Sequence, residues 1–133
     1  MSNVAWVLKW LKRAENDLLT GRRLLTDFHP KQLEISCYQC QQAAEKALKA
    51  YLVMQERAFP YVHDCRKLCL LCAEYDDAFN EYTGDCADLT PYATRARYPQ
   101  DDEMDEPEVQ AALRKAERIV NFCASLITSA LQA

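Results

Sequence analysis

Glycine and proline are scarce in this chain, and their scarcity limits the folds that it can adopt. The 133 residues include only two glycines and five prolines. A many-stranded β fold needs frequent tight turns, and those turns draw on both residue types. Half of the residues are apolar, which is enough for a sizeable core in one domain. The composition therefore predicts one all-α domain that spans residues 1–133.

Targeting and membrane-spanning segments are not expected from the sequence. Lys9, Lys12 and Arg13 interrupt the apolar positions near the N-terminus, and no small-residue cleavage site follows them. The most apolar late stretch, residues 119–131, is too short to span a bilayer. Seven cysteines cannot all pair within one chain, and free thiols are the rule in the cytosol. We therefore expect a soluble cytoplasmic protein without membrane contact.

The charge is unevenly distributed along the chain. The net charge is −4, yet six of the twenty acidic residues lie in the short segment 101–108. The other positions carry sixteen bases against fourteen acids. This balance argues against bulk electrostatic binding to duplex DNA but leaves room for a local basic groove. The acidic segment is interpreted as a solvated loop, with a regulatory role as the alternative.

Apolar residues recur every three to four positions, which predicts an antiparallel up-and-down bundle of four to five helices. Asn3 and Asp64 are suitable N-cap residues, and Tyr75 falls on the apolar face of the third helix. Pro91 cannot donate a backbone hydrogen bond and should kink the fourth helix. The predicted helices cover about residues 4–26, 31–56, 65–75, 86–97 and 107 to near the C-terminus.

The segment 37–52, CYQCQQAAEKALKAYL, is the most informative part of the sequence. One side carries an apolar stripe, and the other carries a polar row of Gln42, Lys46 and Lys49 at helical spacing. The row is either a solvated face or a set of phosphate and ribose contacts. Gln41 and Gln42 can alternatively be buried amides that join helices through hydrogen bonds.

Four segments together resemble the HEPN family of small helical proteins. They are Trp10-Leu11 with residues 14–18, QQAAEKALKAYL at 41–52, His63-Asp64, and Arg97-Tyr98-Pro99. Their order and spacing fit over nearly the whole chain, and QQAAEKALKAYL is the specific part. The resemblance implies an up-and-down bundle that usually forms a homodimer. It also implies a nucleotide-binding role, often beside a minimal nucleotidyltransferase in toxin–antitoxin or accessory pairs.

Many HEPN proteins are metal-independent ribonucleases, and this sequence departs from their motif. In those relatives an Arg is followed, after four to six residues, by a His near the fourth helix. The His moves a proton and the Arg stabilises the charge on phosphorus. The corresponding windows after Arg95 and Arg97 contain no His. Arg57 and His63 have that spacing but lie in a connector, which is the wrong place. The sequence therefore predicts no catalytic residue.

Six residues are predicted to contact a nucleotide or its phosphate: Arg95, Arg97, Tyr98, Lys46, Lys49 and His63. For the two arginines and the tyrosine, capping of a helix C-terminus is the alternative. His63 beside Asp64 can equally belong to a structural helix cap. Trp6 and Trp10, four residues apart, can serve packing, a dimer contact or base stacking.

Two cysteine pairs have the spacing of a zinc site, Cys37-X-X-Cys40 and Cys69-X-X-Cys72. Both pairs fall inside helical patterns without the tight turns that zinc knuckles use. Cys37, Cys40 and Cys72 occupy positions that the apolar stripe requires, and buried cysteine behaves as a small hydrophobe. The sequence therefore predicts neither a metal site nor a cofactor.

Three functional hypotheses follow. The first is a non-catalytic, homodimeric HEPN-type module that binds a nucleotide or a nucleotidyltransferase partner. The second is a ribonuclease toxin that acts on RNA with Arg97 and a remote His such as His63. The third is a structural dimer without a ligand.

Overall fold

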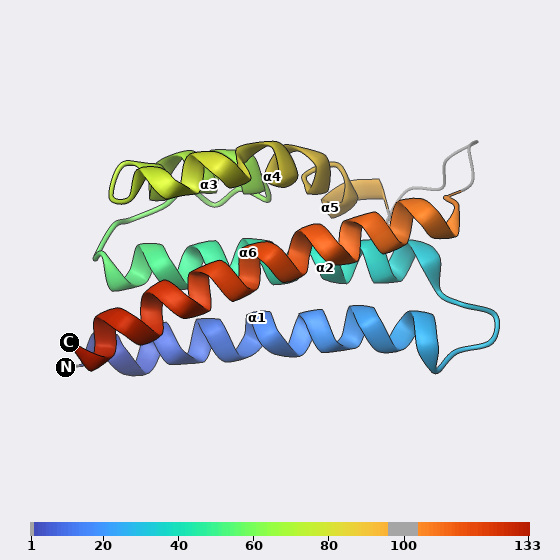
Figure 1. Ribbon diagram of the computed structural model, residues 1–133, viewed down its shortest axis with the longest axis horizontal. Coiled ribbons are helices and arrows are strands. Elements are labelled where there is room, and N and C mark those ends of the chain that lie inside the picture. Colours follow the sequence, from blue (N-terminus) through green and yellow to red (C-terminus); the bar gives the residue numbers. More distant parts are fainter. Residues whose placement is uncertain (1, 96–103) are drawn as a thin grey trace.

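Two long antiparallel helices and a third helix across them form most of the molecule. The computed structural model describes residues 2–95 and 104–133, with Ser2 and Arg95 described by their backbone alone. Helices α1 (Ser2–Thr26) and α2 (Leu33–Met54) run in opposite directions, and α6 (Glu106–Gln132) packs against both. The two ends of the chain consequently lie at the same end of the bundle (Figure 1).

Four short elements form a second layer on the other side of α2. They are α3 (Cys65–Ala73), the 3₁₀ segment η1 (Asp77–Tyr82), α4 (Thr83–Leu89) and α5 (Tyr92–Arg95). The chain doubles back after α3, so that α3 contacts both η1 and α4, and Figure 1 shows this layer running along α2. The described residues contain helices and no strand, which confirms the predicted all-α antiparallel bundle. None of the helices described is both long enough and apolar enough to cross a bilayer.

Helix α2 is the central element of the bundle. It contacts α1, α3, α4, α5 and α6, and thirteen of its 22 residues are buried. Ala43, Ala44, Ala47 and Ala50 are completely buried, and their small side chains let the neighbouring helices approach closely. Because α2 is covered on several sides, polar residues on this helix are buried together with the apolar ones.

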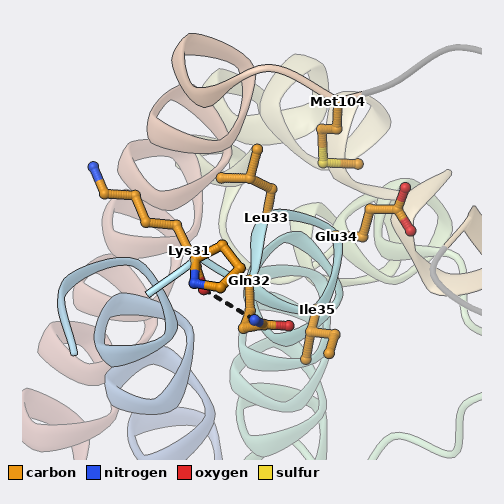
Figure 2. Close-up of a pocket in the computed structure, with 7 residues that line it drawn as sticks. Lys31, Gln32, Leu33, Glu34, Ile35 and Met104 are labelled. Atoms are coloured by element: carbon orange, nitrogen blue, oxygen red, sulfur yellow. Dashed lines mark hydrogen bonds between the residues drawn. The ribbon is translucent and has the colours of Figure 1, made fainter. Parts of the chain in front are cut away.

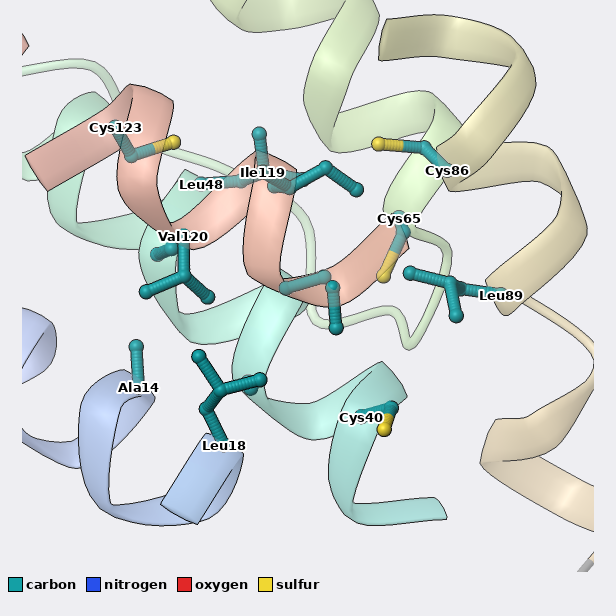
Figure 3. Packing of buried hydrophobic residues seen from close by; sticks show 14 of the residues in the cluster. Ala14, Leu18, Cys40, Leu48, Cys65, Cys86, Leu89, Ile119, Val120 and Cys123 are labelled. Carbon is teal, nitrogen blue, oxygen red and sulfur yellow. The ribbon is translucent and has the colours of Figure 1, made fainter. Parts of the chain in front are cut away.

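The cysteines belong to the hydrophobic core. All seven are buried and none is paired in a disulfide. Figure 3 shows Cys40, Cys65, Cys86 and Cys123 among aliphatic side chains such as Leu48. Burial raises the pKa of Cys40 to about 12, so this thiol stays protonated. The prediction that cysteines occupy apolar positions of the helices is confirmed.

Aspartates begin two of the helices. The Asp64 side chain accepts a hydrogen bond from the Lys67 backbone N–H at 3.0 Å, which confirms the predicted cap of α3. Asp105 accepts in the same way from the Glu108 N–H at 2.8 Å and begins α6. Because Asp64 caps α3, the backbone directly after His63 is held at the start of that helix.

Three local predictions were wrong. Asn3 is not an N-cap, because α1 already includes it. Tyr75 is 42% exposed rather than buried, because α3 ends before reaching it. Pro91 does more than kink a helix: α4 ends at Leu89 and α5 starts at Tyr92, because the proline nitrogen has no hydrogen to donate.

Candidate functional site

Glu45 is the centre of a buried polar network on α2. Its side chain is only 4% exposed. Its Oε1 accepts a hydrogen bond from Gln41 Nε2 at 2.9 Å and lies 3.0 Å from His63 Nδ1, while its Oε2 accepts from Lys49 Nζ at 2.9 Å. An ionised carboxylate only accepts hydrogen bonds, so Nδ1 of His63 is the ring nitrogen that carries a hydrogen and donates it in this contact. Three donors thus compensate one buried carboxylate.

The network keeps Glu45 charged. Burial alone would raise the pKa of this carboxyl, but hydrogen bonds from Lys49, Gln41 and His63 outweigh it, and the pKa lies below its usual value. A buried carboxylate with satisfied acceptors and a matched ammonium is a rigid arrangement. The network therefore fixes the position of Lys49 and His63 relative to α2.

Lys49 does not lie on a solvated face, and that sequence interpretation was wrong. Its side chain is 10% exposed. Its Nζ lies 5.7 Å from the ring centroid of Trp10 and 5.3 Å from that of Phe59. The ammonium is thus held between a carboxylate and two aromatic rings, a favourable setting for a desolvated cation. Lys49 is buried because α1 and the connector after α2 cover this side of α2.

Of the rest of the polar row, Lys46 joins α2 to α1 and Gln42 contacts its neighbour Gln41 on α2. Lys46, with a side chain 24% exposed, forms an ion pair with Asp17 of α1. Gln41 is completely buried, and its Oε1 accepts from Gln42 Nε2 at 2.7 Å. The alternative that these glutamines are buried amides is confirmed for Gln41. Lys46 and Lys49 both have carboxylate partners within the chain, so neither carries an uncompensated charge for a phosphate.

His63 lies where the network meets solvent. Its side chain is 56% exposed although its Nδ1 contacts the buried Glu45 carboxylate. It precedes Asp64, whose side chain caps α3. The structure therefore places His63 at a fixed point of the connector, with an exposed ring edge that a ligand can reach.

A hollow of about 270 Å³ opens beside this network. It is lined by Trp10, Lys49, Phe59 and Tyr61. The Trp10 and Phe59 rings meet edge to face, with centroids 6.3 Å apart and an interplanar angle of 84°. Tyr61 is fully exposed. Aromatic walls of this kind suit a flat ligand.

A larger hollow, of about 420 Å³, lies at the loop between α1 and α2 (Figure 2). Two of its polar side chains are engaged within the chain. Lys31 Nζ contacts both Glu106 carboxylate oxygens, at 2.9 and 3.0 Å, and Gln32 Nε2 donates to the Pro30 carbonyl at 3.0 Å. Leu33, Ile35 and Met104 add apolar lining. This hollow has fewer features of a ligand site than the one beside Lys49.

The predicted contacts in and after α5 stay predictions, because their side chains are not described. Arg97 and Tyr98 lie outside the described residues, and only the backbone of Arg95 is described. Figure 1 shows α5 beside the half of α2 nearer to the α1–α2 loop. Lys49 lies in the other half of α2, and His63 lies in the connector that follows that helix. The structure thus brings together Lys49 and His63 at Glu45, whereas Lys46 contacts Asp17 of α1.

Metal ligands do not converge in the part of the chain that the structure describes. No group of three or more His, Cys, Asp or Glu side chains is arranged there to hold an ion. The paired CXXC spacings lie within α2 and α3, where their thiols belong to the hydrophobic core.

Comparison with known proteins assigns the family. The family model of the HEPN domain matches residues 7–126. The chain belongs to the HEPN family. The match includes all of α2 to α5 and most of α1 and α6. Among curated proteins, none matches this chain.

Solved structures share this HEPN fold. One is ST0689, described as an archaeal HEPN homologue, with a TM-score of 0.70, 25% identity, and coverage of 91% of this chain and 97% of that one. Another is TT1696 from Thermus thermophilus, with a TM-score of 0.76, 23% identity, and coverage of 90% and 96%. These similarities support the bundle architecture and assign no ligand.

Sequence reasoning missed the aromatic part of the candidate site. Phe59 and Tyr61 were interpreted only as parts of a connector, yet both line the hollow beside Lys49. One signal was available, because two aromatic residues flank a proline in this short connector. Which helix they would contact could not be read from the sequence.

Proposed function

We propose that this chain is a non-catalytic HEPN-type module that binds a nucleotide in the hollow lined by Trp10, Lys49, Phe59 and Tyr61. The observation that supports this proposal best is the ring-lined cavity beside an ammonium group. A nucleobase can stack on exposed aromatic faces, and such stacking contributes about 1–3 kcal/mol per base. The exposed edge of His63 lies beside the same network and is available to a phosphate or ribose oxygen.

In this proposal Lys49 has an indirect role. Glu45 compensates its charge, so Lys49 fixes the two rings in position rather than holding a phosphate alone. Lys46 positions α1 through its ion pair with Asp17. Arg95, Arg97 and Tyr98 remain sequence-based proposals for further phosphate contacts.

The module is further proposed to act as a homodimer beside a minimal nucleotidyltransferase, in an accessory or toxin–antitoxin-like pair. Membership of the HEPN family supports this part of the proposal. Light scattering on the purified chain tests the dimer. Co-purification with a small nucleotidyltransferase encoded by a neighbouring gene tests the partner, and independent elution of the two proteins would contradict it.

Calorimetric titration with ATP and GTP tests nucleotide binding. We expect binding that weakens about 5- to 150-fold in the variant Tyr61→Ala. Tyr61 is fully exposed, so its removal leaves the core intact. Phe28→Ala, at an exposed aromatic residue between α1 and α2, is the matched control and should bind normally. Absence of heat and of NMR perturbation with any nucleotide would reject the proposal and leave the structural dimer.

One observation favours a ribonuclease as a second candidate function. The contact between His63 Nδ1 and the Glu45 carboxylate orients the imidazole as in the histidine–carboxylate pairs of general acid–base catalysis. Incubation with RNA in the presence of EDTA distinguishes the two candidates. RNA cleavage that His63→Ala abolishes would establish the enzyme, and intact RNA would support the binding module.

A further inference from the structure

A second hollow adjoins the first on the surface of α1. It measures about 50 Å³ and is lined by Trp6, Lys9, Trp10 and Arg13. Trp10 lines both hollows, so the two are neighbours on either side of this residue or along it. Trp6 is 57% exposed, and Lys9 Nζ lies 5.2 Å from its ring centroid. Aromatic rings therefore line two neighbouring positions rather than one.

We propose that this extended surface binds a single-stranded nucleic acid through at least two neighbouring bases. The inference rests on the proposed nucleotide-binding function and specifies its ligand. One base occupies the hollow of Trp10, Phe59 and Tyr61, and the next stacks on Trp6. A helix rises 1.5 Å per residue, so the four-residue separation places the two indoles about 6 Å apart along α1. Neighbouring bases of a single strand can be splayed over such a distance onto protein rings.

The charges of the surface match a nucleic acid backbone. Among the described residues that line the two hollows, three are cations and none is an acid. Glu45 compensates Lys49, which leaves Lys9 and Arg13 for phosphates. The Arg13 guanidinium can donate two parallel hydrogen bonds to one phosphate. A base pair hides its faces within the duplex stack, so this surface selects single strands over duplexes.

Tryptophan fluorescence tests the inference directly, because Trp6 and Trp10 are the only two tryptophans in the chain. The probes are AMP, a short single-stranded oligonucleotide in RNA and in DNA form, and the corresponding duplex. We expect the single strand to bind at least ten times more tightly than AMP or the duplex. Tighter binding of the RNA form would identify RNA as the ligand. Equal affinities would show that the protein recognises only the bases and phosphates that RNA and DNA share.

Variants separate the two base positions. Trp6→Ala should weaken oligonucleotide binding about 5- to 150-fold and leave AMP binding unchanged. Phe28→Ala, at another exposed aromatic residue, is the control and should change neither. In the double variant Lys9→Gln and Arg13→Gln, the slope of log affinity against log salt should become shallower by about 1.4, which corresponds to two lost phosphate contacts.

The outcomes distinguish this inference from the proposed function. Equal affinity for AMP and oligonucleotide, or no effect of Trp6→Ala, would overturn the second base position while the nucleotide site stands. Absence of binding to both probes would reject the proposed function as well. A fluorescence change that depends only on protein concentration would show that Trp6 lies in a protein–protein contact, and it would overturn the inference.

Discussion

Replacement of Glu45 by Gln tests the buried network most sharply. The substitution keeps the size of the side chain and one acceptor oxygen but removes the negative charge. Lys49, with a side chain 10% exposed, then stays buried beside Trp10 and Phe59 without a counter-ion. Breaking a buried ion pair on one side costs about 3–5 kcal/mol, because the remaining charge is uncompensated.

We expect Glu45→Gln to lower the free energy of unfolding by about 3 kcal/mol, the lower end of that range, because the amide still accepts a hydrogen bond. Such a loss is a large part of the stability of a domain, which is typically about 5–15 kcal/mol. The measurement is urea unfolding followed by circular dichroism at neutral pH. A loss below about 1 kcal/mol, the value expected for an exposed pair, would refute this account of the network.

Two further variants serve as controls for that measurement. Glu117→Gln removes the partner of Arg22 in a pair whose side chains are 36% and 43% exposed. It should cost no more than about 1 kcal/mol. The double variant Glu45→Gln with Lys49→Met removes both buried charges and should recover most of the stability lost in Glu45→Gln. Failure to recover would show that packing, rather than the unpaired charge, determines the loss.

Three smaller predictions complete the set. Below about pH 4.3, the usual carboxyl pKa of Glu, the free energy of unfolding should fall more steeply in the wild type than in Glu45→Gln. The pKa of Glu45 in the folded protein lies below that value, so its stabilisation is complete above about pH 4.3 and is lost as the pH falls through the folded pKa. Parallel pH curves of the two proteins would contradict this. Asp64→Ala removes the cap of α3 and should cost about 0.5–2 kcal/mol in urea unfolding, whereas Asp64→Ser should restore most of it. At mildly alkaline pH, buried thiols such as Cys40 should react with a disulfide reagent only after unfolding, and rapid labelling of the native chain would disprove their burial.

The sequence alone was sufficient for the bundle because its signals are local. The apolar stripe of α2 and the Asp64 cap each report on a few neighbouring residues, and the shortage of glycine can be read from the composition. The buried cysteines could also be assigned from helical periodicity. By contrast, Pro91 separates two helices where the sequence suggested a kink, because the missing N–H of proline is compatible with either outcome.

The candidate site was harder to predict because it depends on contacts between distant segments. Lys49 is buried only because Trp10 from α1 and Phe59 from the connector cover it. His63 reaches Glu45 across eighteen positions of the chain. Periodicity within one helix predicts which residues share a face, but it does not report which neighbouring segment covers that face.

NMR mapping of a nucleotide titration tests the central claim most directly. With AMP added to the ¹⁵N-labelled protein, we predict chemical-shift changes concentrated at Trp10, Lys49 and residues 59–63. Changes confined to α5 and the start of α6 would move the site away from the rings and contradict the account. An unchanged spectrum at saturating AMP would contradict nucleotide binding altogether.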